Sequence, residues 1–114
     1  MRINYAVKDI LKSTPIYSLT LRYRRARQIA NWRQQGRPIP PPSIVKQAIV
    51  IQYARRFQYD TLIETGTFMG DMIDATRGIF KQIYSIELSQ SLHERAQARF
   101  QEYDHITLLQ GDSG

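Results

Sequence analysis

The sequence predicts an α/β protein whose short apolar strands alternate with helices, as in the first half of a doubly wound parallel sheet. Residues 61–64, 83–86 and 106–109 are short runs rich in β-favouring residues, and apolar residues at helical spacing occupy the intervals between them. The connections are short, and consecutive parallel strands joined through helices have a right-handed crossover. The pattern therefore predicts strand, helix, strand, helix, strand in one sheet.

The composition fits one small globular domain and excludes several chemistries. The chain has 114 residues, 42% of them hydrophobic, and contains no Cys, which excludes disulfides, thiolate nucleophiles and Cys-ligated metal sites. No apolar run approaches the roughly 18 residues that a membrane span needs. The first dozen residues lack the apolar core of a secretion signal. We therefore expect a cytoplasmic protein, and the histidine spacing suggests no metal site.

The net charge of +6 is divided unequally along the chain. Residues 1–59 hold three Lys and nine Arg against one acidic residue, whereas residues 60–114 hold four basic residues against nine carboxylates. The basic half is either an arm that binds nucleic acid, anionic lipid or an acidic substrate, or a helical segment that packs on the acidic half. We favour the second interpretation because Arg-rich helices are common as solvated faces.

Two helices are expected before the first strand. Residues 16–35 carry apolar side chains at helical spacing, and a glycine followed by four prolines ends this helix. Ser43 is the expected N-cap of a second helix over 44–57. We accordingly divide the chain into a basic helical arm with a Pro-rich linker, residues 1–42, and a partial sheet domain, residues 43–114.

Two further helices are expected between the strands. The first spans residues 71–80 and follows a loop framed by glycines. The second opens with a capping-box pattern over residues 91–94. It carries Leu92, Ala96 and Phe100 on one face, which is the face expected to cover the sheet.

Candidate site residues converge at the carboxyl ends of the strands, where doubly wound sheets bind their ligands. Gly66 and Gly70 bracket the turn after the first strand, so backbone N–H groups and a helix N-terminus can approach a ligand. Glu87 ends the second strand, 21 residues after Gly66, near the spacing at which a carboxylate accepts hydrogen bonds from ribose hydroxyls. Asp112 follows the third strand and is expected on the same rim.

The glycine loop does not fit two common nucleotide-binding patterns. A phosphate-binding loop would have Gly-Lys-Ser/Thr after Gly70, but Asp71 stands there and would repel a phosphate. A dinucleotide fingerprint would need glycine at the positions of Phe68 and Asp71. The loop therefore predicts an adenosine cofactor without phosphates.

These segments resemble the cofactor motifs of class I S-adenosylmethionine-dependent methyltransferases. Residues 62–70 (LIETGTFMG) resemble the first motif, residues 83–89 (IYSIELS) the second and residues 109–113 (LQGDS) the third. The resemblance covers residues 43–114 and implies a Rossmann-like doubly wound sheet that binds S-adenosylmethionine. It further implies methyl transfer, with a small-molecule O or N nucleophile favoured as acceptor. Phe68 departs from the usual glycine at its position, which implies a narrower loop.

The resemblance also implies individual roles. Glu64 would lie near the cationic methionine portion of the cofactor, and Gly66 and Gly70 would admit it. Glu87 would hold the ribose hydroxyls and Asp112 would meet the adenine amino group. Otherwise the two glutamates are solvated strand-end carboxylates and Asp112 is a turn residue. The expected cofactor-binding residues are Glu64, Thr65, Gly66, Thr67, Phe68, Gly70, Glu87, Leu88, Asp112 and Ser113.

The sequence shows no catalytic residues. In the resembled family the substrate side is formed from the fourth strand onward, so we expect this chain to be the cofactor-binding half of a longer methyltransferase and to be inactive alone. The alternative is a non-enzymatic module whose basic helix, residues 16–35, binds RNA or an acidic partner. The basic residues available for such a partner, or for an anionic surface, are Arg22, Arg24, Arg25, Arg27 and Arg33.

Overall fold

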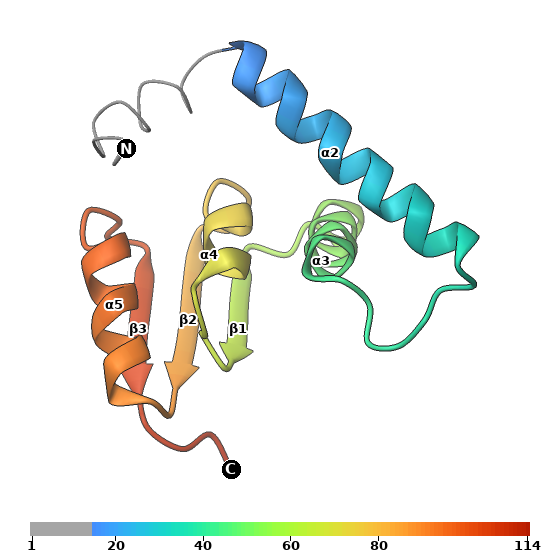
Figure 1. Cartoon of the computed structure of the whole chain (residues 1–114). Helices are drawn as coiled ribbons and strands as arrows, with labels where there is room; N and C mark the ends of the chain where they lie inside the picture. Colours follow the sequence, from blue (N-terminus) through green and yellow to red (C-terminus); the bar gives the residue numbers. More distant parts are fainter. Residues whose placement is uncertain (1–14) are drawn as a thin grey trace, which may run out of the picture. The chain divides into compact units, whose positions relative to one another are not determined.

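The computed structural model describes residues 15–114, apart from the side chain of Tyr17. Residues 1–14, the beginning of the expected arm, lie outside the described part. The chain divides into two compact units, Met1–Val45 and Lys46–Gly114, and each is described by itself (Figure 1). Every helix within residues 15–114 is too short or too polar to cross a membrane.

The first unit contains helix α2, Pro15–Gln34, which confirms the expected basic helix. Its end is closed by backbone bonds: the N–H of Gly36 donates to the carbonyl of Arg33 at 3.2 Å, and the N–H of Arg37 donates to that of Trp32 at 3.0 Å. Gly36 has a φ of 83°, as a helix-ending glycine does. The arginines proposed as contacts for a partner are exposed along α2.

Helix α3, Ser43–Phe57, follows the proline-rich linker. The helix over 44–57 is confirmed, but Ser43 is its first residue and not a cap before it. The N–H of Val45 donates to the carbonyl of Pro42 at 2.9 Å, so the first turn is closed through the backbone of the last proline. Ala54, near the end of α3, is buried in the core of the second unit.

Three parallel strands form the sheet of the second unit, in the order β1-β2-β3. They are β1, Thr61–Thr65, β2, Gln82–Glu87, and β3, Ile106–Gln110. Each predicted strand is present and is slightly longer than expected, and β1 lies at an edge. The Rossmann-like arrangement expected for this half of a doubly wound sheet is thus confirmed.

Helix α4, Asp71–Thr76, connects β1 to β2 and is shorter than the predicted helix over 71–80. The hydroxyl of Thr76 donates back to the carbonyl of Met72 at 2.7 Å, and the carbonyl of Thr76 accepts from the N–H groups of Ile79 and Phe80. This turn brings Phe80 into the core, where it is buried. Helix α4 therefore ends early because the turn after it places the Phe80 side chain in the core.

Helix α5, Gln90–Phe100, connects β2 to β3. The capping box expected at residues 91–94 is wrong, because the N-cap is Ser89. Its hydroxyl oxygen accepts from the N–H of Leu92 at 3.4 Å. The helix accordingly begins two residues earlier than that pattern indicated, at Gln90 in place of Leu92.

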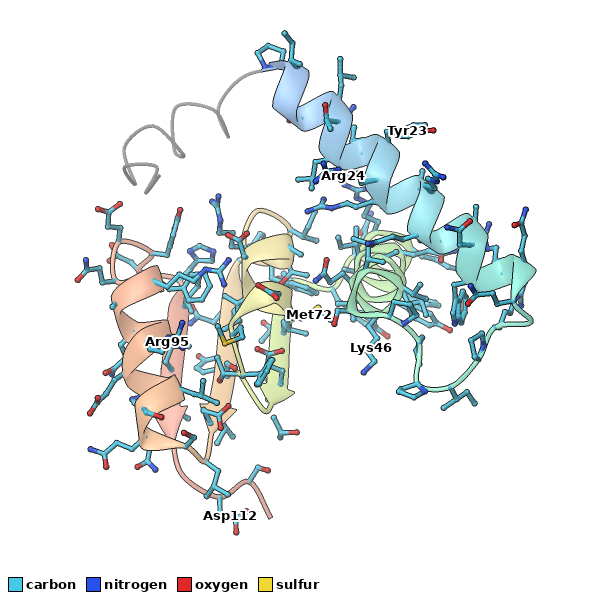
Figure 2. All side chains as sticks on the ribbon, viewed as in Figure 1. Tyr23, Arg24, Lys46, Met72, Arg95 and Asp112 are labelled. Atoms are coloured by element: carbon cyan, nitrogen blue, oxygen red, sulfur yellow. The ribbon has the colours of Figure 1, made fainter. Side chains whose placement is uncertain are left out.

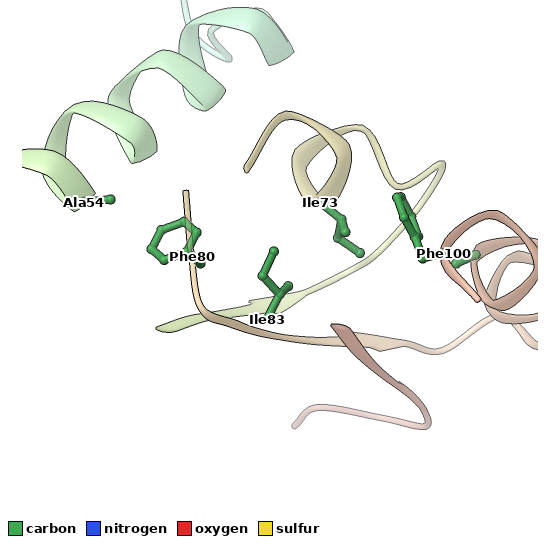
Figure 3. Packing of buried hydrophobic residues seen from close by; sticks show 6 residues of the cluster. Ala54, Ile73, Phe80, Ile83 and Phe100 are labelled. Atoms are coloured by element: carbon green, nitrogen blue, oxygen red, sulfur yellow. The ribbon is translucent and has the colours of Figure 1, made fainter. Parts of the chain in front are cut away.

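The core lies on one face of the sheet, between the strands and the helices (Figure 3). The parallel register places Leu62, Ile83 and Ile106 side by side on this face. The buried residues of this core come from α3, α4, α5, β2 and the turn before β2. They are Ala54, Ile73, Phe80, Ile83, Ala96 and Phe100.

The opposite face of the sheet is open. Ile63 of β1 is 69% exposed, and its partner in the register, Tyr84 of β2, is 38% exposed. Leu109 of β3 also lies on this face and is exposed. Parallel sheets are usually covered by helices on both faces, so this surface and the edge of β1 are available for further packing.

Candidate cofactor site

The two glycines of the loop after β1 differ in their surroundings. Both have a positive φ, 81° at Gly66 and 86° at Gly70. A Cβ added at Gly66 would meet no atom within 4 Å, whereas one at Gly70 would lie 2.7 Å from Cε2 of Phe100. Gly66 therefore leaves open space at the strand end, and Gly70 allows the start of α4 to pack closely on α5.

Arg99 of α5 supports the loop near Gly70. Its Nη1 donates to the carbonyl of Met69 at 2.7 Å, and the same nitrogen lies 3.3 Å from Oδ1 of Asp71. Nη2 lies 3.4 Å from Oδ2 of Asp74. Helix α5 thus holds the carboxyl side of the glycine loop by both packing and charge-assisted hydrogen bonds.

Phe68 does not narrow the loop toward the strand ends. Its φ is 50°, and its N–H donates to Oε1 of Glu87 at 2.8 Å. The ring is mostly exposed and lines a pocket of about 210 Å³ together with Met69 and three residues of α5, Leu92, Arg95 and Arg99. The backbone of Phe68 therefore faces Glu87, while its side chain extends toward α5.

Glu87 joins the two loops that follow β1 and β2. Its Oε1 accepts from the N–H of Phe68, and its Oε2 accepts from the N–H of Ser89 at 3.0 Å. The bonds from Ser89 and Phe68 lower the pKa of Glu87 and outweigh the opposing effect of burial at 8% exposure. A carboxylate has about four acceptor positions. Because one N–H group donates to each oxygen of Glu87, each oxygen keeps a free acceptor position. Two neighbouring hydroxyl groups of a ligand could donate to these two positions.

Glu64 lies at the end of β1 within a chain of hydroxyl groups. Ser85 of β2 donates from Oγ to Oε1 of Glu64 at 2.7 Å, and the hydroxyls of Ser85 and Thr67 are 2.6 Å apart. Burial raises the pKa of Glu64, and the bond from Ser85 opposes this increase in part. The structure thus brings Glu64 and the glycine loop together through Ser85.

Sequence reasoning missed Ser85. It occupies an inward position of a strand whose neighbours on the same face are Ile83 and Glu87, and it is fully buried. A hydroxyl at such a position needs a hydrogen-bond partner. The alternation of inward and outward residues in β2 was the signal that could have identified it.

The segment after β3 is tied to the end of β2. The N–H of Gly111 donates to the carbonyl of Glu87 at 2.9 Å, and Nε2 of Gln110 donates to the carbonyl of Leu88 at 3.0 Å. Asp112 is exposed beyond this tie, and its Oδ1 accepts from the N–H of Gly114 (Figure 2).

Three other expected site residues point outward. Leu88 and Ser113 are exposed, and Thr65 alternates with Glu64, so its side chain belongs to the open face of the sheet. The structure therefore joins Glu64 to Thr67 through Ser85, and Phe68 to Glu87. Among residues 15–114, no hydrogen bond joins Asp112 or Ser113 to these residues.

Comparison with known proteins identifies the fold. No family model and no curated protein matches the chain. A putative O-methyltransferase from Klebsiella pneumoniae is 19% identical with a TM-score of 0.55, covering 96% of this chain and 49% of its own. A putative caffeoyl-CoA O-methyltransferase from Staphylococcus aureus is 15% identical with a TM-score of 0.57, covering 84% and 49%. This chain has the class I S-adenosylmethionine-dependent methyltransferase fold.

A third similar structure holds the cofactor. It is an amino pentose methyltransferase from Micromonospora echinaspora with S-adenosylmethionine bound, 22% identical, with a TM-score of 0.51, and the match covers 59% of this chain and 28% of that one. The chain therefore spans less than half the length of each of these methyltransferases.

Proposed function

We propose that this chain is the cofactor-binding half of an S-adenosylmethionine-dependent methyltransferase. The observation that carries the proposal is Glu87, an ionised carboxylate held by two loop N–H groups at the ends of parallel strands. Each of its oxygens keeps an acceptor position for a hydroxyl of the cofactor ribose. A phosphate ligand is disfavoured, because two carboxylates, Glu64 and Glu87, face the same strand ends.

S-adenosylmethionine supplies an activated methyl group that a nucleophile accepts by in-line displacement, so the protein contributes mainly through position. Glu87 fixes the ribose, and Gly66 leaves the open space beside it. The carboxylate of Glu64 favours the cationic methionine portion at the end of β1. Asp112, on the rim after β3, is the proposed contact of the adenine amino group.

We propose a small molecule with an O or N nucleophile as the methyl acceptor. The proposal is supported by similarity to two O-methyltransferases and an amino pentose methyltransferase. The residues described here form the cofactor side, and the chain is under half the length of these proteins. We therefore propose that the acceptor binds to a part of the protein outside residues 15–114, and that this part also supplies the general base.

Calorimetric titration with S-adenosylmethionine tests the proposal. We expect Glu87→Gln to weaken binding about tenfold to a hundredfold, because hydrogen bonds to a charged acceptor are lost. Glu94→Gln is the matched control: Glu94 is an exposed glutamate on α5 whose side chain accepts a hydrogen bond from Gln90. Equal affinities for all three proteins, or no binding to the wild type, would refute the cofactor assignment.

A further inference from the structure

A chain of buried hydroxyl groups connects the glycine loop to Glu64, the residue proposed to lie near the cationic portion of the cofactor. It consists of Thr67, Ser85 and Glu64, with oxygen separations of 2.6 Å and 2.7 Å. Ser85 is in register with Glu64 on the neighbouring strand and is completely buried, and Thr67 is 5% exposed. Its hydroxyl groups are therefore shielded from water, which could otherwise replace a missing partner.

The direction of the hydrogen bonds is set by the charge at one end. An ionised carboxylate can only accept, so the single hydroxyl hydrogen of Ser85 points to Glu64. The oxygen of Ser85 then accepts the hydroxyl hydrogen of Thr67. All the donors point toward Glu64, and this arrangement favours the charged form of its side chain.

Among the described residues near Glu64, no cation is placed to stabilise its charged form in place of Ser85. On β2 the titratable neighbour on the same face is Glu87, whose oxygens are bound by the N–H groups of Phe68 and Ser89. At the far end of the loop, Asp71 is paired with Arg99. Within residues 15–114 no basic side chain forms an ion pair with Glu64, so Ser85 supplies the donor that opposes the cost of burial.

We propose that Ser85 is a positioning residue that keeps the Glu64 carboxylate ionised and aimed at the cationic portion of the cofactor, and couples it to the glycine loop through Thr67. The proposal rests on the proposed function, since that function defines the ligand that Glu64 meets. It assigns a role to a serine that lies within the segment resembling the second cofactor motif, but for which the resemblance implies no role. The role depends on the hydroxyl group, because Ser85 is completely buried and its Oγ is the donor to Glu64.

The first test is an NMR titration of the Glu64 carboxyl group in this chain without cofactor. Ser85→Ala removes the hydroxyl from a small buried side chain, and we expect the pKa of Glu64 to increase by about one to two units, the equivalent of one charge-assisted hydrogen bond. Thr67→Val should shift the pKa in the same direction by less, because Ser85 still donates. Thr67→Ser, which keeps the hydroxyl, should leave it unchanged.

The second test is the pH dependence of S-adenosylmethionine affinity. We expect affinity to increase with pH as Glu64 ionises. In Ser85→Ala the pH at which this increase occurs should shift upward by the same amount as the pKa of Glu64. A general loss of structure would instead lower the affinity equally at every pH. An unchanged pKa of Glu64 in both Ser85→Ala and Thr67→Val would overturn the positioning role. Failure of the wild-type chain to bind the cofactor, with the pKa shifted as expected, would instead refute the proposed function. Thr67→Val provides the same measurement if Ser85→Ala does not fold.

Discussion

The contact between Gly70 and Phe100 allows a quantitative test of how α5 supports the glycine loop. Gly70 has a φ of 86°, and a Cβ there would lie 2.7 Å from Cε2 and 3.1 Å from Cζ of Phe100. The ring of Phe100 is 3% exposed and belongs to the core, so it has little room to move. Gly70→Ala therefore introduces both backbone strain and overpacking.

The two costs can be separated with a matched glycine. A side chain in the left-handed region costs about 1–2 kcal/mol, and overpacking of a core costs about 1–3 kcal/mol. We expect Gly70→Ala to lower the free energy of unfolding by about 2–5 kcal/mol, the combined range. Gly66 has a similar φ but no atom within 4 Å of the added Cβ, so Gly66→Ala should lose only the first, about 1–2 kcal/mol.

Urea unfolding followed by circular dichroism measures these differences. The double variant Gly70→Ala, Phe100→Leu should lose less than the sum of its two single changes, because the smaller side chain relieves the contact. For the affinity toward S-adenosylmethionine the order of the two variants should reverse. Gly66→Ala should lose more affinity than Gly70→Ala, since its Cβ fills the space proposed for the cofactor. Equal losses of stability for Gly66→Ala and Gly70→Ala would refute the argument that Phe100 is what constrains position 70.

Two further predictions concern pH and the open face of the sheet. The folded pKa of Glu87 is lowered, so its stabilising contribution is complete above its unfolded value of 4.5 and is lost as the pH falls through the folded value. Amide hydrogen exchange at Phe68, corrected for its intrinsic pH dependence, should then show that protection is lost as the pH falls. In a Glu87→Gln variant, whose side chain does not titrate, the protection should not change with pH. We expect the uncovered face and the unpaired edge of β1 to make the chain self-associate. Ile63→Lys, on the open face at the edge strand, should reduce this self-association in analytical ultracentrifugation without lowering stability. Unchanged association would show that the open face around Ile63 is not the contact surface.

The sheet could be predicted from the sequence because its signals are local. Short β-branched runs such as residues 106–109 end at glycines or polar residues, and the alternation with helices permits only a parallel order. The end of α4 could not be predicted in this way. It depends on the burial of Phe80 against residues distant in sequence, and Thr76 carries no local sign that its hydroxyl would bond to the preceding turn.

The candidate site was predictable where it depends on strand ends, and not where it depends on register. Glu64, Gly66 and Glu87 are placed by the point at which a strand stops, which the sequence indicates directly. The contribution of Ser85 emerges only when β2 is aligned with β1, because that alignment sets the serine beside Glu64. The N-cap at Ser89 was missed for a different reason: the local pattern favours Ser91, which is followed by Glu94 three residues later, whereas the residue three after Ser89 is Leu92.

Phe68 illustrates a constraint that side-chain patterns do not describe. Its contribution to the site is a main-chain N–H, which every residue except proline possesses. Proline is also excluded by the positive φ, whereas glycine, asparagine or another aromatic residue would preserve the hydrogen bond to Glu87. Natural variation at this position should therefore favour glycine and asparagine, admit other side chains at a backbone cost, disfavour β-branched residues and exclude proline. A search for loops of this kind should score the backbone geometry that a residue permits before it scores the identity of the residue.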